Sequence, residues 1–120
     1  MEILIAEDND LNYMILERLI RTVVDATIIR AENGREAVEY CKDHPETALV
    51  FMDIKMPVMD GYEATRQIRE IYPALPIVAQ TAHAMTENKD AAFRAGCNDY
   101  LVKPILKENL KHVIEKYLGK

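Results

Sequence analysis

The apolar run Ala48-Leu49-Val50-Phe51-Met52 ends directly at the carboxylate of Asp53. A short run without a polar residue is typical of a parallel strand that is covered on both faces. The run therefore predicts a strand inside a layered α/β domain. It also places a carboxylate at the carboxyl end of that strand, where open parallel sheets bind their ligands.

Strand-like and helix-like segments alternate on either side of this run. The other predicted strands cover residues 2–6, 26–29, 76–80 and 100–102. Apolar residues at helical spacing predict helices within residues 11–23, 34–43, 60–71, 86–94 and 106–117. Asn33 and Asp60 are the predicted helix caps. The apolar face predicted for the first helix comprises Leu11, Met14, Ile15, Leu19, Ile20 and Val23.

Five strand-to-helix units in strict alternation predict a parallel sheet with helices on both faces, joined by right-handed crossovers. No linker-like or low-complexity stretch interrupts the chain, so residues 1–120 are expected to form one domain. The fold class is therefore α/β, a doubly wound (βα)5 sandwich.

Composition narrows the classes of function. The chain of 120 residues carries a net charge of -5, which argues against direct binding of nucleic acid. Cys41 and Cys97 lack zinc-ligand spacing, so we expect free thiols in a reducing cytoplasm. No apolar run approaches the roughly 20 residues that cross a bilayer, so we expect no membrane contact by this domain.

Polar residues that could bind a ligand or take part in a reaction stand at the ends of four predicted strands. Glu7 and Asp8 follow the first strand, Asp53 the third, Thr81 the fourth and Lys103 the fifth. Because the carboxyl ends of parallel strands meet at one edge of a sheet, we expect these side chains to converge. Together they predict a cation site beside a nucleophile.

Three crowded carboxylates repel one another unless a cation offsets their charge. Oxygen ligands favour Mg²⁺ over zinc, and Mn²⁺ is expected to substitute for it. A carboxylate can accept a phosphoryl group, and Asp53 is the predicted acceptor because it ends the most apolar strand. Lys103 would neutralise phosphoryl oxygens, and the Thr81 hydroxyl would follow the new group inward as a switch.

Four fragments resemble the receiver domains of bacterial two-component signalling. They are Glu7-Asp8-Asn9, the stretch from Met52 to Gly61 (MDIKMPVMDG), Thr81-Ala82 and Lys103-Pro104. The resemblance spans the chain. It implies a flavodoxin-like sheet of order 2-1-3-4-5, Mg²⁺ held by Glu7, Asp8, Asp53 and the Lys55 carbonyl, and phosphoryl contacts from Thr81 and Lys103. It further implies Tyr100 as an aromatic switch residue and a cis peptide between Lys103 and Pro104.

The same resemblance implies a role in a phosphorelay. The phosphoryl donor would be a phosphohistidine on a histidine kinase or a histidine phosphotransfer domain. The opening from Glu7 to Asn12 looks most like receivers fused to hybrid sensor kinases, so the chain is expected to belong to a larger, membrane-bound protein or to stand alone in the cytoplasm. The response face would change on phosphorylation and could support a homodimer.

Three other functions compete with a signalling switch that assists its own phosphorylation without turning over a separate substrate. A Mg²⁺-dependent phosphatase or phosphotransferase usually needs a second carboxylate near the nucleophile, where this chain has Lys55. A nucleotide-binding domain needs glycine-rich phosphate loops, which the sequence lacks. A protein-binding platform without phosphorylation would require loss of an acceptor, metal or lysine position, and all of them are present.

Overall fold

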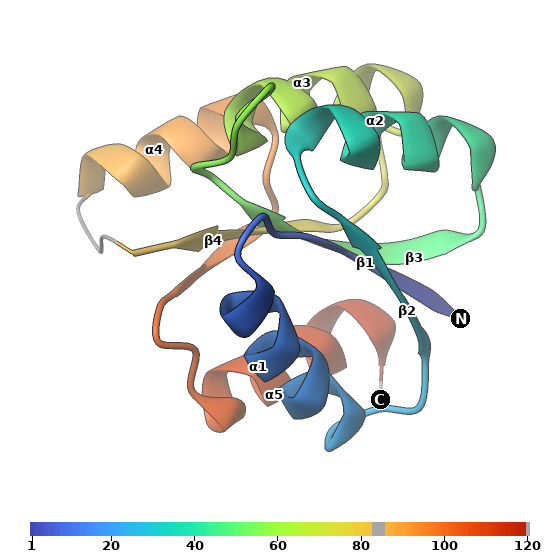
Figure 1. The fold of residues 1–120 in the computed structure, drawn as a ribbon, viewed down its shortest axis with the longest axis vertical. Coiled ribbons are helices and arrows are strands. Elements are labelled where there is room, and N and C mark those ends of the chain that lie inside the picture. Colours follow the sequence, from blue (N-terminus) through green and yellow to red (C-terminus); the bar gives the residue numbers. More distant parts are fainter. Residues whose placement is uncertain (83–85, 120) are drawn as a thin grey trace.

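The computed structural model of the protein describes residues 1–82 and 86–119, with the backbone alone at residues 86 and 87. Strands and helices alternate strictly in this part of the chain (Figure 1). None of the described helices is long and apolar enough to cross a membrane. In chain order the elements are β1 (Glu2–Ala6), α1 (Asp10–Arg21), β2 (Thr27–Ala31), α2 (Gly34–Asp43), β3 (Thr47–Asp53), α3 (Gly61–Ile71), β4 (Ile77–Thr81), α4 (Thr86–Ala95), β5 (Asp99–Val102) and α5 (Lys107–Leu118).

The five strands form one parallel sheet in the order β2-β1-β3-β4-β5, as predicted. Helices α1 and α5 cover one face, and α2, α3 and α4 cover the other (Figure 1). From β1 the chain moves outward to β2, whereas from β3 it moves the opposite way to β4. Loops diverge at such a switch point, and the crevice between them lies beyond the ends of β1 and β3.

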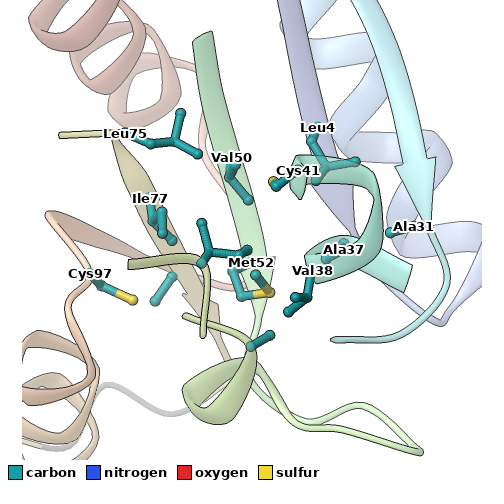
Figure 2. Packing of buried hydrophobic residues seen from close by; sticks show 14 of the residues in the cluster. Leu4, Ala31, Ala37, Val38, Cys41, Val50, Met52, Leu75, Ile77 and Cys97 are labelled. Carbon is teal, nitrogen blue, oxygen red and sulfur yellow. The ribbon is translucent and has the colours of Figure 1, made fainter. Parts of the chain in front are cut away.

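The unbroken apolar run of β3 is explained by cores on both faces of the sheet. Leu49 and Phe51 face α1 and α5, whereas Val50 and Met52 face α2, α3 and α4. Figure 2 shows Val50 and Met52 among the side chains of the second core. This core also contains Leu4, Ala31, Ala37, Val38, Cys41, Ile77 and Cys97. Both predicted free cysteines are free and buried.

Side chains cap the N-termini of three helices at the end of the sheet where the crevice lies. Asn33 accepts a hydrogen bond from the Glu36 amide, and Asp60 accepts one from the Glu63 amide, each at 2.9 Å. These contacts confirm both predicted caps. Asn9 caps α1 in the same way, accepting from the amide of Asn12 at 2.8 Å. The caps satisfy amide groups that a helix start otherwise leaves without partners.

The predicted apolar face of the first helix is partly wrong. Leu11, Met14 and Ile15 are 59%, 36% and 48% exposed, and the residues that α1 buries are Leu16 and Ile20. Residues 16 and 20 stand four apart and share the stripe that faces the sheet. Residues 11 and 15 form a separate stripe, turned by about 140° around the helix. The face of α1 beside the pocket is therefore apolar but open to solvent.

Gly61 brings the start of α3 into contact with the end of β3. Its amide donates to the Ile54 carbonyl at 2.9 Å, and a Cβ added there would lie 2.2 Å from the backbone oxygen of Asp53. That separation is far below a normal contact, so a side chain at this position must displace the end of the strand.

We therefore expect Gly61→Ala to lower the free energy of unfolding by about 2–4 kcal/mol in urea denaturation. The matched control is Gly119→Ala, because Gly119 has a φ of 71° but, chain neighbours aside, no atom of the described residues lies within 4 Å of an added Cβ. It should cost about 1 kcal/mol through backbone strain alone. Equal losses in the two variants would contradict the close packing of α3 on β3.

Candidate functional site

Glu7 is a buried carboxylate at the end of β1. The residue is 1% exposed. Its Oε1 accepts a hydrogen bond from Lys103 Nζ at 3.0 Å, and its Oε2 accepts one from the backbone amide of Asn9 at 3.2 Å. The next residue, Asp8, is exposed and lines a hollow at this edge of the sheet, as Glu7 does. The loop after β1 thus supplies one fixed carboxylate and one accessible carboxylate.

Asp53 is the last residue of β3 and is 6% exposed. Its Oδ1 accepts a hydrogen bond from Lys103 Nζ at 3.2 Å. Lys103 follows β5, two strands away, so its side chain reaches across the end of β4. One ammonium group therefore joins buried carboxylates from the ends of β1 and β3.

A hollow of about 810 Å³ opens at this edge of the sheet, and Glu7, Asp8 and Asp53 are among the residues that line it. One carboxylate oxygen from each of Glu7, Asp8 and Asp53 lies within 4.8 Å of the others. Over residues 1–82 and 86–119, no other group of three histidine, cysteine or acidic residues converges in this way. A set made only of oxygens suits a hard divalent cation such as Mg²⁺ better than zinc.

The surroundings of Asp53 disfavour the ionised form of its side chain. Burial and the nearby Glu7 carboxylate together raise the pKa of Asp53 to about 7, although the Lys103 ammonium acts in the opposite direction. The two carboxylates cannot both be ionised without repulsion in this buried position. A divalent cation at the same oxygens would favour their ionised forms.

Lys103 experiences the opposite balance. Burial works against its charge, but hydrogen bonds and the negative charges of Glu7 and Asp53 outweigh it and raise the Lys103 pKa. The lysine therefore stays protonated at neutral pH. Its ammonium is a fixed positive charge that can meet anionic oxygens at Asp53.

The structure brings most of the other predicted site residues to the same hollow. Lys55 and Thr81 both line it. The peptide bond between Lys103 and Pro104 is cis. Tyr100 lies apart, half-buried on β5, where its ring meets Phe93 edge-on with a centroid distance of 6.1 Å.

Two residues in and behind the pocket were not predicted from the sequence. Gln80 is a buried polar residue of β4 that lines the hollow, and within the described residues its Nε2 has no hydrogen-bond partner. Arg30 holds the loop after β1 from the neighbouring strand. The only signal in the sequence for Gln80 was its place as a polar residue in an otherwise apolar strand. Arg30 lies beyond the predicted strand 26–29, because β2 extends to Ala31.

Known proteins that are similar to this chain in sequence or in structure are numerous. The chain matches the family described as the response regulator receiver domain over residues 3–115. It is 40% identical over 121 residues to hybrid signal transduction histidine kinase G of Dictyostelium discoideum, covering 98% of this chain and 4% of that protein. The chain spans 17% or less of the length of three such curated relatives.

Two solved structures are similar to nearly the whole chain. The receiver domain of sensor histidine kinase PA1611 from Pseudomonas aeruginosa holds a magnesium ion in its active site cleft; it is 33% identical, with a TM-score of 0.90 and coverage of 99% of this chain and 98% of that one. The receiver domain of Saccharomyces cerevisiae Ssk1, in complex with the histidine phosphotransfer protein Ypd1, is 35% identical, with a TM-score of 0.89 and coverage of 98% and 88%.

The raised pKa of Asp53 predicts how stability varies with pH when metal is removed. The ordinary pKa is 3.8 and the folded value is about 7, so between these values the folded protein keeps a proton that the unfolded chain has lost. The free energy of unfolding should therefore fall as the pH rises from about 4 to about 7. In EDTA at pH 8, Asp53→Asn should be more stable than the unmodified protein by on the order of 1–3 kcal/mol.

Urea denaturation at a series of pH values measures this difference. Asp43→Asn is the control, because Asp43 is exposed at the end of α2 and its substitution should leave the pH profile unchanged. Two results would show that the fold does not disfavour the charge of Asp53. One is a lower stability of Asp53→Asn than of the unmodified protein at pH 8, and the other is an equal dependence of stability on pH in these two proteins.

Proposed function

The chain belongs to the family of response regulator receiver domains of two-component signalling, and we propose that it is a phosphorylation switch whose phosphoryl acceptor is Asp53. The observation that carries this proposal is the bridge from Lys103 Nζ to both Glu7 and Asp53, with Asp8 close by. It combines a buried carboxylate, a fixed ammonium and a set of oxygen ligands in one hollow. Residues 1–120 would act as a single receiver unit.

The acidic residues would hold Mg²⁺, with Mn²⁺ as a substitute. Glu7, Asp8, Asp53 and the carbonyl of Lys55 are the proposed binding groups, and the first three already converge within 4.8 Å. When bound, the cation neutralises charge on the carboxylates and on the incoming phosphoryl oxygens. The strained ionisation of Asp53 supports this assignment, because a cation there lowers the cost of its negative form.

Transfer would proceed by attack of an Asp53 carboxylate oxygen on the phosphorus of a phosphohistidine. An O–P bond forms, the N–P bond breaks, and its electron pair returns to the imidazole nitrogen. Lys103, which contacts Asp53 at 3.2 Å, would exchange part of that contact for the new phosphoryl oxygens. Attack of water on the phosphorus of the aspartyl phosphate would break the Asp53 O–P bond, release inorganic phosphate and restore the carboxylate. The chain's own residues thus assist both steps, and no separate substrate is turned over.

The response would pass from Thr81 to the face made by α4, β5 and α5. Thr81 lines the hollow at the end of β4, next to Val102 of β5, so its hydroxyl can follow a phosphoryl oxygen. Tyr100 contacts α4 through Phe93 and Lys89, the ammonium of which lies 4.7 Å from the ring centroid. We propose that motion of α4 changes the setting of Tyr100, and that the altered face supports a homodimer.

The donor domain would dock on the open apolar face of α1. Leu11 and Ile15 are about half exposed, and Leu106, in the loop before α5, is 54% exposed. A crevice of about 100 Å³ between α1 and that loop shares Asn12 and Lys103 with the acidic hollow. A partner covering these residues would bring a phosphohistidine to Asp53. Exposed apolar clusters of this kind commonly mark protein interfaces.

The partner would be a histidine kinase or a histidine phosphotransfer domain, and the chain would work alone or as part of a hybrid kinase. Two free, buried cysteines support a reducing, cytoplasmic location. The net charge of -5 supports a protein partner rather than nucleic acid.

Treatment with acetyl phosphate tests the acceptor directly. Intact mass should rise by one phosphoryl group in the presence of Mg²⁺ and should not change in EDTA. Asp53→Asn should give no adduct, because the amide cannot act as the nucleophile, whereas Asp43→Asn should react like the unmodified protein. An adduct of equal yield on Asp53→Asn would place the acceptor elsewhere.

Replacement of Ile15 by Asp tests the docking face. Phosphotransfer from a phosphohistidine-bearing domain that reacts with the unmodified chain should slow by at least about tenfold, because a buried apolar contact is lost. Labelling by acetyl phosphate should be unchanged. Ile71→Asp is the control, since Ile71 is 39% exposed on α3, on the other face of the sheet. Equal slowing by both substitutions would argue against docking on α1.

A further inference from the structure

Arg30 reaches from β2 into the loop that carries Glu7 and Asp8. It lies opposite Ile5 in the register of the sheet, on the edge strand beside β1 (Figure 1). Its Nε and one terminal nitrogen both donate to the backbone oxygen of Glu7 at 3.1 Å. The other terminal nitrogen pairs with Asp10 at 2.8 Å.

The guanidinium is also held from its flat side. It lies over the ring of Tyr13, with 4.8 Å between its central carbon and the ring centroid. Its side chain is only 21% exposed. A planar group with several fixed donors, stacked on an aromatic ring, gives a defined orientation that a flexible lysine cannot reproduce.

The bonded carbonyl matters because of the peptide to which it belongs. The oxygen of Glu7 and the nitrogen of Asp8 lie in one planar unit, so fixing the direction of the oxygen fixes the plane that leads to the Asp8 Cα. The preceding residue is anchored as well, because the Glu7 amide donates to the Ala31 carbonyl at 2.9 Å. Bonds to β2 on both sides of Glu7 thus set the path of the loop.

We propose that Arg30 is a positioning residue for the cation site: by gripping the Glu7 carbonyl, it sets where the Asp8 carboxylate points relative to Glu7 and Asp53. This inference rests on the proposed function, since it concerns the residues proposed to hold Mg²⁺. Arg30 does not line the acidic hollow, so its effect on the site would be indirect. Groups that orient metal ligands in this way commonly change affinity by about 10–100-fold when removed.

Electrostatics and positioning predict opposite effects when the arginine is removed. Arg30 is a positive charge beside an acidic pocket, so its charge alone repels a divalent cation, and its loss would tighten Mg²⁺ binding. If orientation of the loop dominates, its loss weakens binding. The sign of the change therefore separates the two roles.

The experiment titrates Mg²⁺ into isotopically labelled protein and follows the amide signals of residues 7–9 and 53 by NMR. The variants are Arg30→Met, which keeps an unbranched chain against Tyr13, and Arg30→Lys, which keeps the charge. Arg21→Met is the matched control, because Arg21 forms an exposed ion pair with Glu17 within α1. Amide hydrogen exchange of Asn9 in EDTA gives a second, metal-free measurement.

We expect Arg30→Met to weaken Mg²⁺ binding about tenfold, Arg30→Lys to weaken it to a smaller extent, and Arg21→Met to leave it unchanged. Exchange of the Asn9 amide, which donates to Glu7, should accelerate in both Arg30 variants without metal. Unchanged or tighter binding in Arg30→Met would overturn the proposal, as would a lysine variant identical to the unmodified protein.

The experiment distinguishes a missing Mg²⁺ site from a missing role of Arg30. If the unmodified protein does not bind Mg²⁺, the proposed function fails, whereas the metal-free exchange of Asn9 still decides whether Arg30 fixes the loop. If the unmodified protein binds Mg²⁺ and the Arg30 variants match it, only the role of Arg30 is wrong.

Discussion

Repulsion between two buried carboxylates is the constraint on which the rest of the site depends. Glu7 and Asp53 are almost completely buried, and both accept a hydrogen bond from the same ammonium group of Lys103. One positive charge cannot balance two or three negative ones, as the raised pKa of Asp53 reflects. Stability and reactivity are therefore linked: the arrangement that makes the metal-free site costly is the one that attracts a cation and an anionic phosphoryl group.

The fold provides the burial that this chemistry needs. Because the sheet has a core on each face, β1 and β3 are fully interior strands. The residues at their ends therefore lie where little water reaches them. The switch in strand order opens the crevice there, and the loops around it are held at several points. Gly61 presses α3 onto the end of β3, and Arg30 fixes the loop after β1 from the neighbouring strand. Rigid supports of this kind keep like charges close together.

Much of this could be predicted from the sequence because the signals were local. The apolar run before Asp53 predicted a strand with two covered faces, and Asn33 and Asp60 predicted helix starts. The exposure of Leu11 and Ile15 could not be predicted, because helical spacing marks apolar stripes without saying which one meets the sheet. The role of Arg30 was also hidden, since it depends on the pairing of β2 with β1 across about 25 residues of chain. Contacts set by register and tertiary packing leave no local pattern.

The most direct test of the central claim is the free energy of unfolding as a function of Mg²⁺ concentration, at pH 7.5 and constant ionic strength maintained with KCl. If a cation relieves the repulsion at Glu7, Asp8 and Asp53, stability should rise with the logarithm of Mg²⁺ concentration above the dissociation constant, by about 2.7 kcal/mol at a hundredfold excess over that constant. A stability that does not change over the same series would contradict the account, because the carboxylates would then be accommodated without a cation.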